Sequence, residues 1–293
     1  QLEVRAALNG AMDNEGLRHW QHVAQGQPAG GVVYLHNRTR TSAHDTASAM
    51  RVTATGAELA RAFWDVADHP TLVLTLDAGA GEAVVIEKVV ALYTSREVAG
   101  DQVVGRAVNA AQRAPSWETA YAANAAAWQV EWERTDVEIE GDAEAQVAVR
   151  FNLFQMLIAA PRHDGRVNIG AKTLSGFGYR GHAFWDTEIF MLPLFTYTAP
   201  HIARNLLTYR YRNLPAARAK ARANGFEGAQ FPWESADTGE EVTPTWVPHF
   251  ADRTKLVRIW TGDIEIHISA DIAYAAHQYW QATGDNEWLM AQG

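Results

Sequence analysis

NAAQRAPSWETAYAANAAAWQVEWE, residues 109–133, marks the place where the chain changes from strand-forming to helix-forming sequence. The stretch is rich in Ala, Gln, Glu and Trp, and helix-forming residues run through its whole length. Pro115 suits the first turn of a helix, so a helix is expected to begin near it. The stretch therefore separates two parts of the chain that have different hydrophobic periodicities.

The part before about residue 100 has the pattern of β-strands. Apolar residues alternate with their neighbours at Leu2, Val4, Ala6 and Leu8, and again at Leu72, Leu74 and Leu76. The runs GGVVYLHNRTRTS (30–42) and AVVIEKVVALYTS (83–95) are β-branched and bounded by Gly or Ser. Repeated short strands separated by turns predict a β-sandwich. One exception is AELARAFWDVAD (57–68), which predicts a short helix in a connection.

The part after the divide has the pattern of helices. A helix is expected to begin near Asp142 and to end at Pro161, with an apolar stripe at Val147, Phe151, Phe154 and Ile158. Further helices are expected at 187–197, 200–212, 215–224, 266–283 and 285–291. Strands followed only by helices predict two domains joined by a helical linker rather than an alternating α/β fold. The predicted boundaries are 1–105 for the strand domain, 106–141 for the linker and 142–293 for the helical domain.

Composition excludes several classes of function. The 293 residues are 47% hydrophobic and 20% charged with a net charge of −9, which is typical of a soluble globular protein and unlike a nucleic-acid binder. Lys and Arg are densest between Arg204 and Arg222, where their spacing predicts solvated helix faces. No apolar run approaches the roughly 18–20 residues that a membrane helix needs.

The absence of cysteine rules out disulfides, thiolate catalysis and Cys-bound metals, and it fits a reducing cytoplasm. The N-terminus, QLEVRAALNG, lacks both the features of a signal peptide and a starting Met. We therefore expect a cytoplasmic protein and a trimmed or partial chain.

Three irregular segments between the predicted helices combine Gly, Trp and carboxylates. They are SGFGYRGHAFWDTEIF (175–190), GAQFPWESADTGEEVT (228–243) and RIWTGDIEIHISADI (258–272). An aromatic ring packs on the apolar face of a pyranose, and a carboxylate accepts charge-assisted hydrogen bonds from sugar hydroxyls. This mixture predicts a carbohydrate site.

Other kinds of site fit these segments poorly. Gly176, Gly178 and Gly181 spell GxGxxG, but no βαβ context surrounds them and bulky residues follow, so we expect a tightly turning loop rather than a dinucleotide site. The histidines show no metal-ligand spacing, and GxSxG, the serine hydrolase motif, is absent. His182 and His267 lie inside the three segments, which sets them apart from the other histidines.

GYRGHAFWDTEIFMLP (178–193) resembles the signature of glycoside hydrolase family 65, the family of trehalose, kojibiose and maltose phosphorylases. ARNLLTYRYRNLPAARAKARANGFEGAQFPWESADTGEE (203–241) and RIWTGDIEIHISADIAYA (258–275) extend the similarity. VIEKVVALYTSRE (85–97) carries it more loosely into the strand-rich part. The resemblance implies an N-terminal β-sandwich, a helical linker and an (α/α)₆ barrel, of which this chain would contain part of the sandwich and the first part of the barrel.

The resemblance also implies roles for individual residues. Trp185 and Asp186 are expected to hold the glucosyl unit in subsite −1, and Trp233 and Glu234 to shape subsite +1. His267 and Ser269 are expected on the acceptor side, and Arg180 and His182 are expected to make further contacts. The alternatives are that both tryptophans are ordinary core residues and that Asp186 caps a helix.

Two departures from the family pattern bear on activity. Phe177 stands where a Glu or a small residue is expected, which leaves the linkage specificity open. The general acid Glu, the phosphate-binding residues and a Lys-Gln pair for the sugar are expected beyond Gly293. No residue of this chain is therefore assigned as the acid.

The implied reaction is inverting phosphorolysis of an α-linked glucose disaccharide, trehalose or kojibiose, to β-glucose 1-phosphate and glucose. Inorganic phosphate would be the nucleophile and co-substrate, with no metal, no organic cofactor, no nucleic-acid or membrane partner, and a possible homodimer. Two alternatives stay open. One is an inverting hydrolase of the same family, which would add a carboxylate base to activate water. The other is a non-catalytic carbohydrate-binding or structural fragment.

Overall fold

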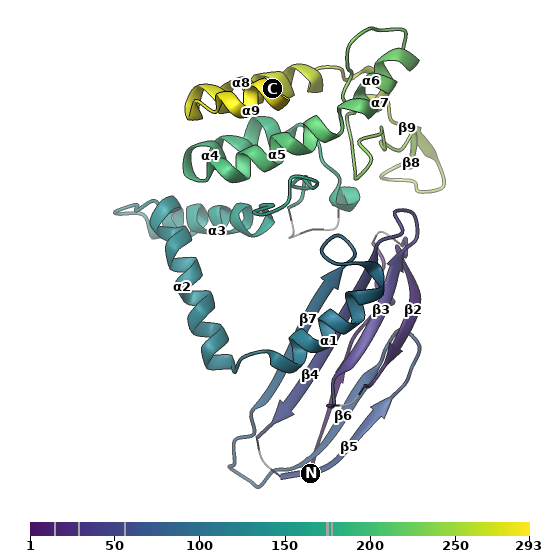
Figure 1. Ribbon diagram of the computed structural model, residues 1–293, viewed down its shortest axis with the longest axis vertical. Helices are drawn as coiled ribbons and strands as arrows, with labels where there is room; N and C mark the ends of the chain where they lie inside the picture. Colours follow the sequence, from purple (N-terminus) through teal and green to yellow (C-terminus); the bar gives the residue numbers. More distant parts are fainter. Residues whose placement is uncertain (15, 29, 56, 174–175, 177) are drawn as a thin grey trace. The chain divides into compact units, whose positions relative to one another are not determined.

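The computed structural model describes residues 1–14, 16–28, 30–55, 57–173, 176 and 178–293 (Figure 1). The chain forms two compact units, Gln1–Trp128 and Gln129–Gly293, and the division falls within one long helix. Among the described residues, no helix combines the length and the apolar character needed to cross a membrane.

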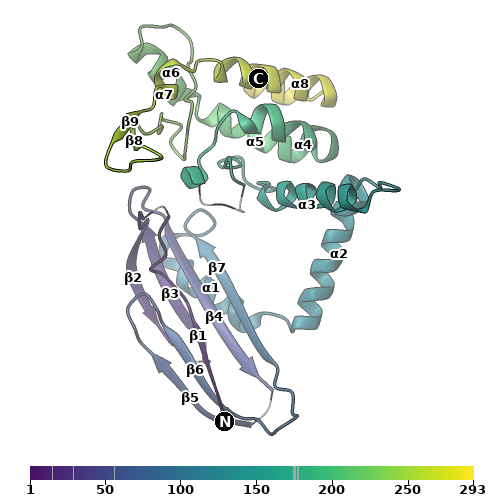
Figure 2. The same ribbon diagram turned by 180° about the vertical axis from the view of Figure 1, so that it is seen from behind.

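The described residues of the first unit form seven antiparallel strands in two sheets. The strands are β1 (Leu2–Ala7), β2 (Trp20–Gly26), β3 (Val33–Thr39), β4 (Asp45–Ala54), β5 (Ala57–Trp64), β6 (Thr71–Asp77) and β7 (Ile86–Thr94). One sheet has the order β1-β6-β5 and the other the order β2-β3-β4-β7. Figure 2 shows the three-stranded sheet in front of the four-stranded one. The predicted strand-rich sandwich is present.

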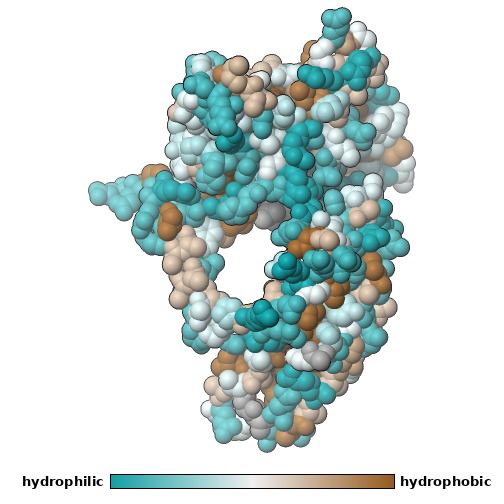
Figure 3. Space-filling model, viewed as in Figure 1, coloured by the Kyte–Doolittle hydropathy of each residue, from teal (hydrophilic) through white to brown (hydrophobic). Residues whose placement is uncertain are grey.

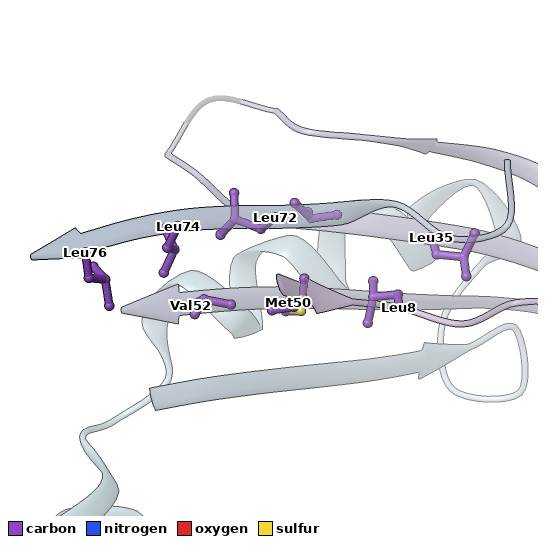
Figure 4. Close-up of a cluster of buried hydrophobic side chains, with 9 residues drawn as sticks. Leu8, Leu35, Met50, Val52, Leu72, Leu74 and Leu76 are labelled. Atoms are coloured by element: carbon purple, nitrogen blue, oxygen red, sulfur yellow. The ribbon is translucent and has the colours of Figure 1, made fainter. Parts of the chain in front are cut away.

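The core of the sandwich comes from alternating residues of both sheets (Figure 4). Leu72, Leu74 and Leu76 of β6 are fully buried and pair in register with β1, where Leu74 lies opposite Val4. Met50 of β4 closes the same cluster from the other sheet. Removing this much apolar surface from water is the main force that holds the two sheets together.

Most of the segment 57–68 is a strand, β5 (Ala57–Trp64), where a short helix was expected. β5 pairs with β6 from Ala57 opposite Asp77 to Trp64 opposite Thr71, with a register shift between Glu58 and Ala60. Ala, Glu, Leu and Arg all favour a helix, but pairing with the buried strand β6 overrides this local preference.

Helix α1 (Val103–Arg113) covers the outer face of the four-stranded sheet, in front of it in Figure 1. Its buried side chains, Val103, Ala107 and Ala111, recur every four residues and pack on the small residues of β4. Pro115 follows α1, and helix α2 (Trp117–Thr135) begins two residues later, as the proline predicted. The side chains of α2 are mostly exposed.

The second unit is mainly helical, and the expected helices are present. They are α3 (Ala143–Ala159), a π-helical turn η3 (Thr187–Met191), α4 (Leu192–Thr198), α5 (Pro200–Arg212), α6 (Leu214–Ala223), α8 (Ile268–Thr283) and α9 (Asn286–Gln292). One further short helix, α7 (Thr261–Ile264), was not predicted. Asp142 caps α3, since its carboxylate accepts from the backbone N–H of Ala145 at 2.9 Å. Helix α5 packs against both α4 and α8.

Two expectations about this unit are wrong. A small hairpin, β8 (Trp246–Pro248) and β9 (Leu256–Arg258), interrupts what was predicted to be helices only. Strands of three residues are too short for their alternation to be recognised in sequence. The basic residues between Arg204 and Arg222 are also not all solvated, because Arg210 is 2% exposed.

The apolar stripe of α3 is helical as predicted but largely exposed. Val147 is 68% exposed, Phe151 58% and Phe154 36%, whereas Leu157 is buried. In Figure 3, hydrophobic residues likewise interrupt the hydrophilic surface on the face in view. The stripe thus follows the helical period, but its first two residues, Val147 and Phe151, are mostly accessible to solvent.

Candidate functional site

Backbone pairing brings the first two of the three predicted segments together. Ala183 and Ser235 form an isolated antiparallel bridge, with Ala183 N donating to Ser235 O at 2.8 Å and Ser235 N donating to Ala183 O at 3.0 Å. Trp185 and Asp186 follow Ala183 within three residues, and Trp233 and Glu234 directly precede Ser235. The bridge therefore places the expected donor-side and acceptor-side residues on adjoining strands of backbone.

An aromatic cluster adds the third segment. The imidazole of His267 lies edge-on to the indole of Trp185, with ring centroids 4.9 Å apart, and edge-on to Trp233 at 5.7 Å. Both tryptophans also pack against a small apolar cluster that contains Phe231 and Ile268. Each indole is half-buried, so neither is a wholly buried core residue.

A carboxylate holds the His267 ring in place. Nδ1 of His267 lies 2.5 Å from Oδ2 of Asp271, one helical turn along α8. A carboxylate oxygen accepts, so Nδ1 donates the proton and Nε2 is the second hydrogen-bonding atom of the ring. Asp271 thus fixes the orientation of the imidazole that contacts both tryptophans.

His182 and Glu234 form a second imidazole–carboxylate pair. Nδ1 of His182 lies 2.6 Å from Oε1 of Glu234. The Glu234 side chain is 7% exposed and that of His182 is 21% exposed. A carboxylate buried to this extent needs a hydrogen-bonding partner, and the imidazole supplies it.

Glu241 supports the Trp233–Glu234 backbone, and the sequence did not single it out. Its carboxylate accepts from Trp233 N at 2.9 Å, from Glu234 N at 3.2 Å and from the Thr243 hydroxyl at 2.6 Å. Nζ of Lys220, on α6, donates to Glu241 at 2.5 Å and to Gly262 O at 3.0 Å. Glu241 and Lys220 therefore join the second and third segments.

The protonation of Glu241 follows from these contacts. Burial alone would raise the pKa of this carboxyl, but the hydrogen bonds from Lys220, from Thr243 and from the backbone of Trp233 lower it below its usual value. Glu241 is therefore an ionised anchor at neutral pH. As the second of two consecutive glutamates in an acidic loop, Glu241 carries no distinctive sequence signal for such a role.

Asp186 is half-buried at the start of η3. Its backbone is helical, with φ −51° and ψ −37°, and its side chain makes no capping hydrogen bond. The alternative of a helix cap is thus wrong. Among the described residues none donates a hydrogen bond to this carboxylate.

Arg180 lies on an exposed left-handed turn, η2 (Gly178–Gly181), in which Tyr179 has φ 59° and Arg180 has φ 54°. Such a backbone costs on the order of 1 kcal/mol for each non-glycine residue. His182 N closes the turn on Tyr179 O at 2.9 Å. The expected tight turn is present, whereas Phe177 lies outside the described residues.

Gly170 is required where this turn meets the chain before it. A Cβ on Gly170 would lie 2.9 Å from the Gly181 Cα, which leaves no room for a side chain. Ser269 has a structural contact, since its hydroxyl accepts from Phe231 N at 3.1 Å. Of the predicted site residues, five are thus linked by contacts around His267 and Glu234 through the paired segments: Trp185, Trp233, His267, His182 and Glu234.

The arrangement offers two aromatic faces, two imidazoles and carboxylates within three adjoining segments. Half-buried indoles can stack on sugar rings, and carboxylates and ring nitrogens can bond hydroxyl groups. These are the components of a carbohydrate-binding site.

Two sequence models of one family match the chain. The glycosyl hydrolase family 65 N-terminal domain matches residues 1–130, and the glycosyl hydrolase family 65 central catalytic domain matches residues 150–293.

Named relatives have several activities. A kojibiose phosphorylase of Halothermothrix orenii is 39% identical over 100% of this chain and 39% of its own length. An alpha,alpha-trehalose phosphorylase of Thermoanaerobacter brockii is 36% identical over 77% of this chain and 28% of its own. A kojibiose hydrolase of Flavobacterium johnsoniae is 43% identical over 57% of this chain and 22% of its own. The chain thus spans well under half the length of these relatives.

One solved structure, of a protein from the human microbiome provisionally named as a kojibiose phosphorylase, has the same fold. It matches with a TM-score of 0.82 over 98% of this chain and 36% of its own, at 23% identity. Together, the two matched domains cover the sandwich unit and the segments of the site. The chain belongs to glycosyl hydrolase family 65.

Proposed function

We propose that this chain is part of an inverting α-glucoside phosphorylase of the kojibiose or trehalose type. The reaction transfers a glucosyl group from an α-linked disaccharide to inorganic phosphate and yields β-glucose 1-phosphate and glucose. The observation that carries the proposal is the contact of His267 with both Trp185 and Trp233, which joins the expected donor-side and acceptor-side residues in one cluster. Membership of the family supports it.

The proposed roles follow the two paired segments. Trp185 and Asp186 hold the glucosyl unit that is transferred, and the Asp186 carboxylate is available because no described group donates to it. Trp233 and Glu234 hold the leaving sugar, with His182 orienting Glu234. Arg180, His267 and Ser269 border these contacts. The residues of this chain bind and orient the two sugars, which converts binding energy into correct alignment.

The chemical step needs a proton on the glycosidic oxygen while phosphate attacks the anomeric carbon from the opposite face. The C–O bond to the leaving glucose breaks as the bond to phosphate oxygen forms, and the proton goes to the departing oxygen. We propose that the acid and the phosphate-binding groups come from outside the 293 residues. The helices α3 to α9 would then be the first part of an (α/α)₆ barrel, in a homodimer that needs no metal or organic cofactor.

A hydrolase of the same family is the second candidate, because a kojibiose hydrolase is 43% identical to this chain over 166 residues. In a hydrolase, water would replace phosphate as the nucleophile, and a carboxylate base would activate it.

A panel of disaccharides tests the proposed substrate class. The longest natural form of the protein, including any segments outside the 293 residues, is incubated with phosphate and with kojibiose, trehalose, maltose or sucrose. Glucose 1-phosphate from kojibiose or trehalose, in preference to maltose, is the expected result. Turnover of sucrose alone, or of none of these sugars, would contradict the proposal.

A further inference from the structure

Arg210 is a buried, charged residue that lies outside the three segments of the site. It lies on α5, is 2% exposed and forms a two-pronged ion pair with Glu188, which is 1% exposed. Nε donates to Oε1 of Glu188 and Nη2 donates to Oε2, each at 2.8 Å. The planar guanidinium matches the carboxylate in a way that a lysine ammonium does not.

The remaining donors of Arg210 reach both paired segments. Nη2 donates to Phe184 O at 2.8 Å, next to Trp185. Nη1 donates to the Ser235 hydroxyl at 3.3 Å, next to Glu234. One side chain on a helix thus holds the two segments on either side of the Ala183–Ser235 bridge.

Tyr209, the preceding residue, reinforces the second of these contacts. Its hydroxyl donates to Ala236 O at 2.6 Å and lies 3.0 Å from the Ser235 hydroxyl. Tyr209 is 3% exposed. Two consecutive residues of α5 therefore hold the Ser235 hydroxyl and the Ala236 carbonyl.

A buried ion pair is not an efficient way to gain stability. The cost of removing both charges from water offsets much of their attraction, and apolar residues of similar volume often stabilise as well. The charged pair instead provides directional hydrogen bonds, and each of them holds a specific backbone or side-chain atom in position.

We propose that Arg210, together with Glu188 and Tyr209, is a positioning residue that sets the spacing between the donor-side pair Trp185–Asp186 and the acceptor-side pair Trp233–Glu234. The inference rests on the proposed function for the identity of the two sides. The spacing matters because the scissile bond must lie between them, and a misplacement of about 1 Å can cost roughly 10²-fold in rate.

The variant Arg210→Lys keeps the positive charge but loses the guanidinium and its two-pronged ion pair. The variant Tyr209→Phe removes one hydroxyl from the same hydrogen-bond network. Tyr279→Phe is the matched control. Tyr279 is also buried, at 2% exposed, and its hydroxyl donates to Asp285 at 2.9 Å, away from the two segments. Its ring packs on Trp288 with centroids 5.2 Å apart.

The first measurement is steady-state phosphorolysis of kojibiose by the full-length protein. Arg210→Lys should lower kcat by about 10²-fold and Tyr209→Phe by about 10-fold, whereas Tyr279→Phe should stay within about twofold of wild type. Melting temperatures of the two Tyr→Phe variants should fall by similar amounts, since each loses the hydrogen-bonded hydroxyl of a buried tyrosine. A kcat loss that merely follows the melting temperature in all three variants would overturn the proposal.

The second measurement does not need activity. In protein labelled with 5-fluorotryptophan, the ¹⁹F resonances of Trp185 and Trp233 should both shift in Arg210→Lys and in Tyr209→Phe. Tyr279→Phe should shift Trp288 instead. If the wild-type protein does not phosphorolyse kojibiose, the proposed function fails. The resonances would still test whether Arg210 determines the positions of Trp185 and Trp233. Unchanged Trp185 and Trp233 resonances would overturn the positioning role, and Tyr209→Phe carries the test if Arg210→Lys does not fold.

Discussion

Nδ1 of His182 lies 2.6 Å from Oε1 of Glu234, although 52 positions separate the two residues in the chain. The two residues are direct neighbours of Ala183 and Ser235, whose backbone bridge brings the two segments together. An acidic side chain this well buried is held in one orientation by its single imidazole partner. The pair therefore gives the proposed acceptor side a fixed carboxylate.

Loss of the Glu234 charge should weaken the binding of the leaving sugar on the acceptor side. Glu234→Gln should lower kcat/KM for kojibiose by about 10–100-fold, because a charge-assisted hydrogen bond is worth roughly 1.5–3 kcal/mol. Glu144→Gln, at an exposed position on α3, is the matched control and should have no effect. Steady-state kinetics on the two variants gives the comparison, and equal activity in both would remove Glu234 from the site.

Asp186 should affect activity without affecting stability. Asp186→Ala should abolish phosphorolysis, through loss of charge-assisted hydrogen bonds to the glucosyl hydroxyls. Its melting temperature should match that of wild type, since no described group donates to the carboxylate. Thermal unfolding and kinetics on the same preparation test both halves. A destabilised Asp186→Ala protein, or one that keeps its activity, would contradict the assignment.

Glu241 should stabilise the folded protein at pH values above the pKa of its carboxyl group. Because hydrogen bonds lower the pKa of this carboxyl in the folded state, its contribution is present above the unfolded pKa and is lost as pH falls through the folded value. At pH 7, Glu241→Gln should therefore reduce the free energy of unfolding, by roughly 1–3 kcal/mol.

Urea unfolding of both proteins between pH 7 and pH 3 tests this linkage. The difference in free energy should shrink as the solution becomes more acidic. Glu240→Gln, at the neighbouring exposed position, is the control. A difference that stays constant, or grows in acid, would mean that Glu241 is not held ionised by Lys220 and Thr243.

The 293-residue chain purified by itself should be inactive and poorly soluble. None of its residues is assigned as the general acid, which usually contributes roughly 10²–10⁴-fold. Phe151 and Phe154 are exposed on α3, and apolar patches of this kind promote association. Size-exclusion chromatography should show association that Phe151→Gln with Phe154→Gln reduces. Robust turnover by the isolated chain would show that its acid lies within these residues.

The sandwich strands were predictable because their signal is local. Leu72, Leu74 and Leu76 alternate along one strand, so the sequence shows the buried face directly. Segment 57–68 was wrong because its outcome depends on β6, a partner that local propensity does not register. The hairpin at Trp246–Pro248 was missed because a three-residue strand shows no period.

The residues of the site also differ in whether their role is visible in the local sequence. Trp185, Trp233 and Glu234 stand out because Gly, Trp and carboxylates are concentrated around them in the sequence. Arg210 and Glu241 do not, because their importance comes from hydrogen bonds to residues 20 or more positions away or to a neighbouring backbone. Arg210 also lies in a basic, helix-forming stretch, where a solvated side chain is the ordinary expectation.

The most direct test of the account is the dependence of disaccharide cleavage on phosphate. The full-length protein is incubated with kojibiose, with and without phosphate, and the products are followed by ¹H NMR at the anomeric positions. The account predicts β-glucose 1-phosphate and an equal amount of glucose when phosphate is present, and no cleavage when it is absent. Release of two glucose molecules at the same rate without phosphate would contradict it and would make the protein a hydrolase.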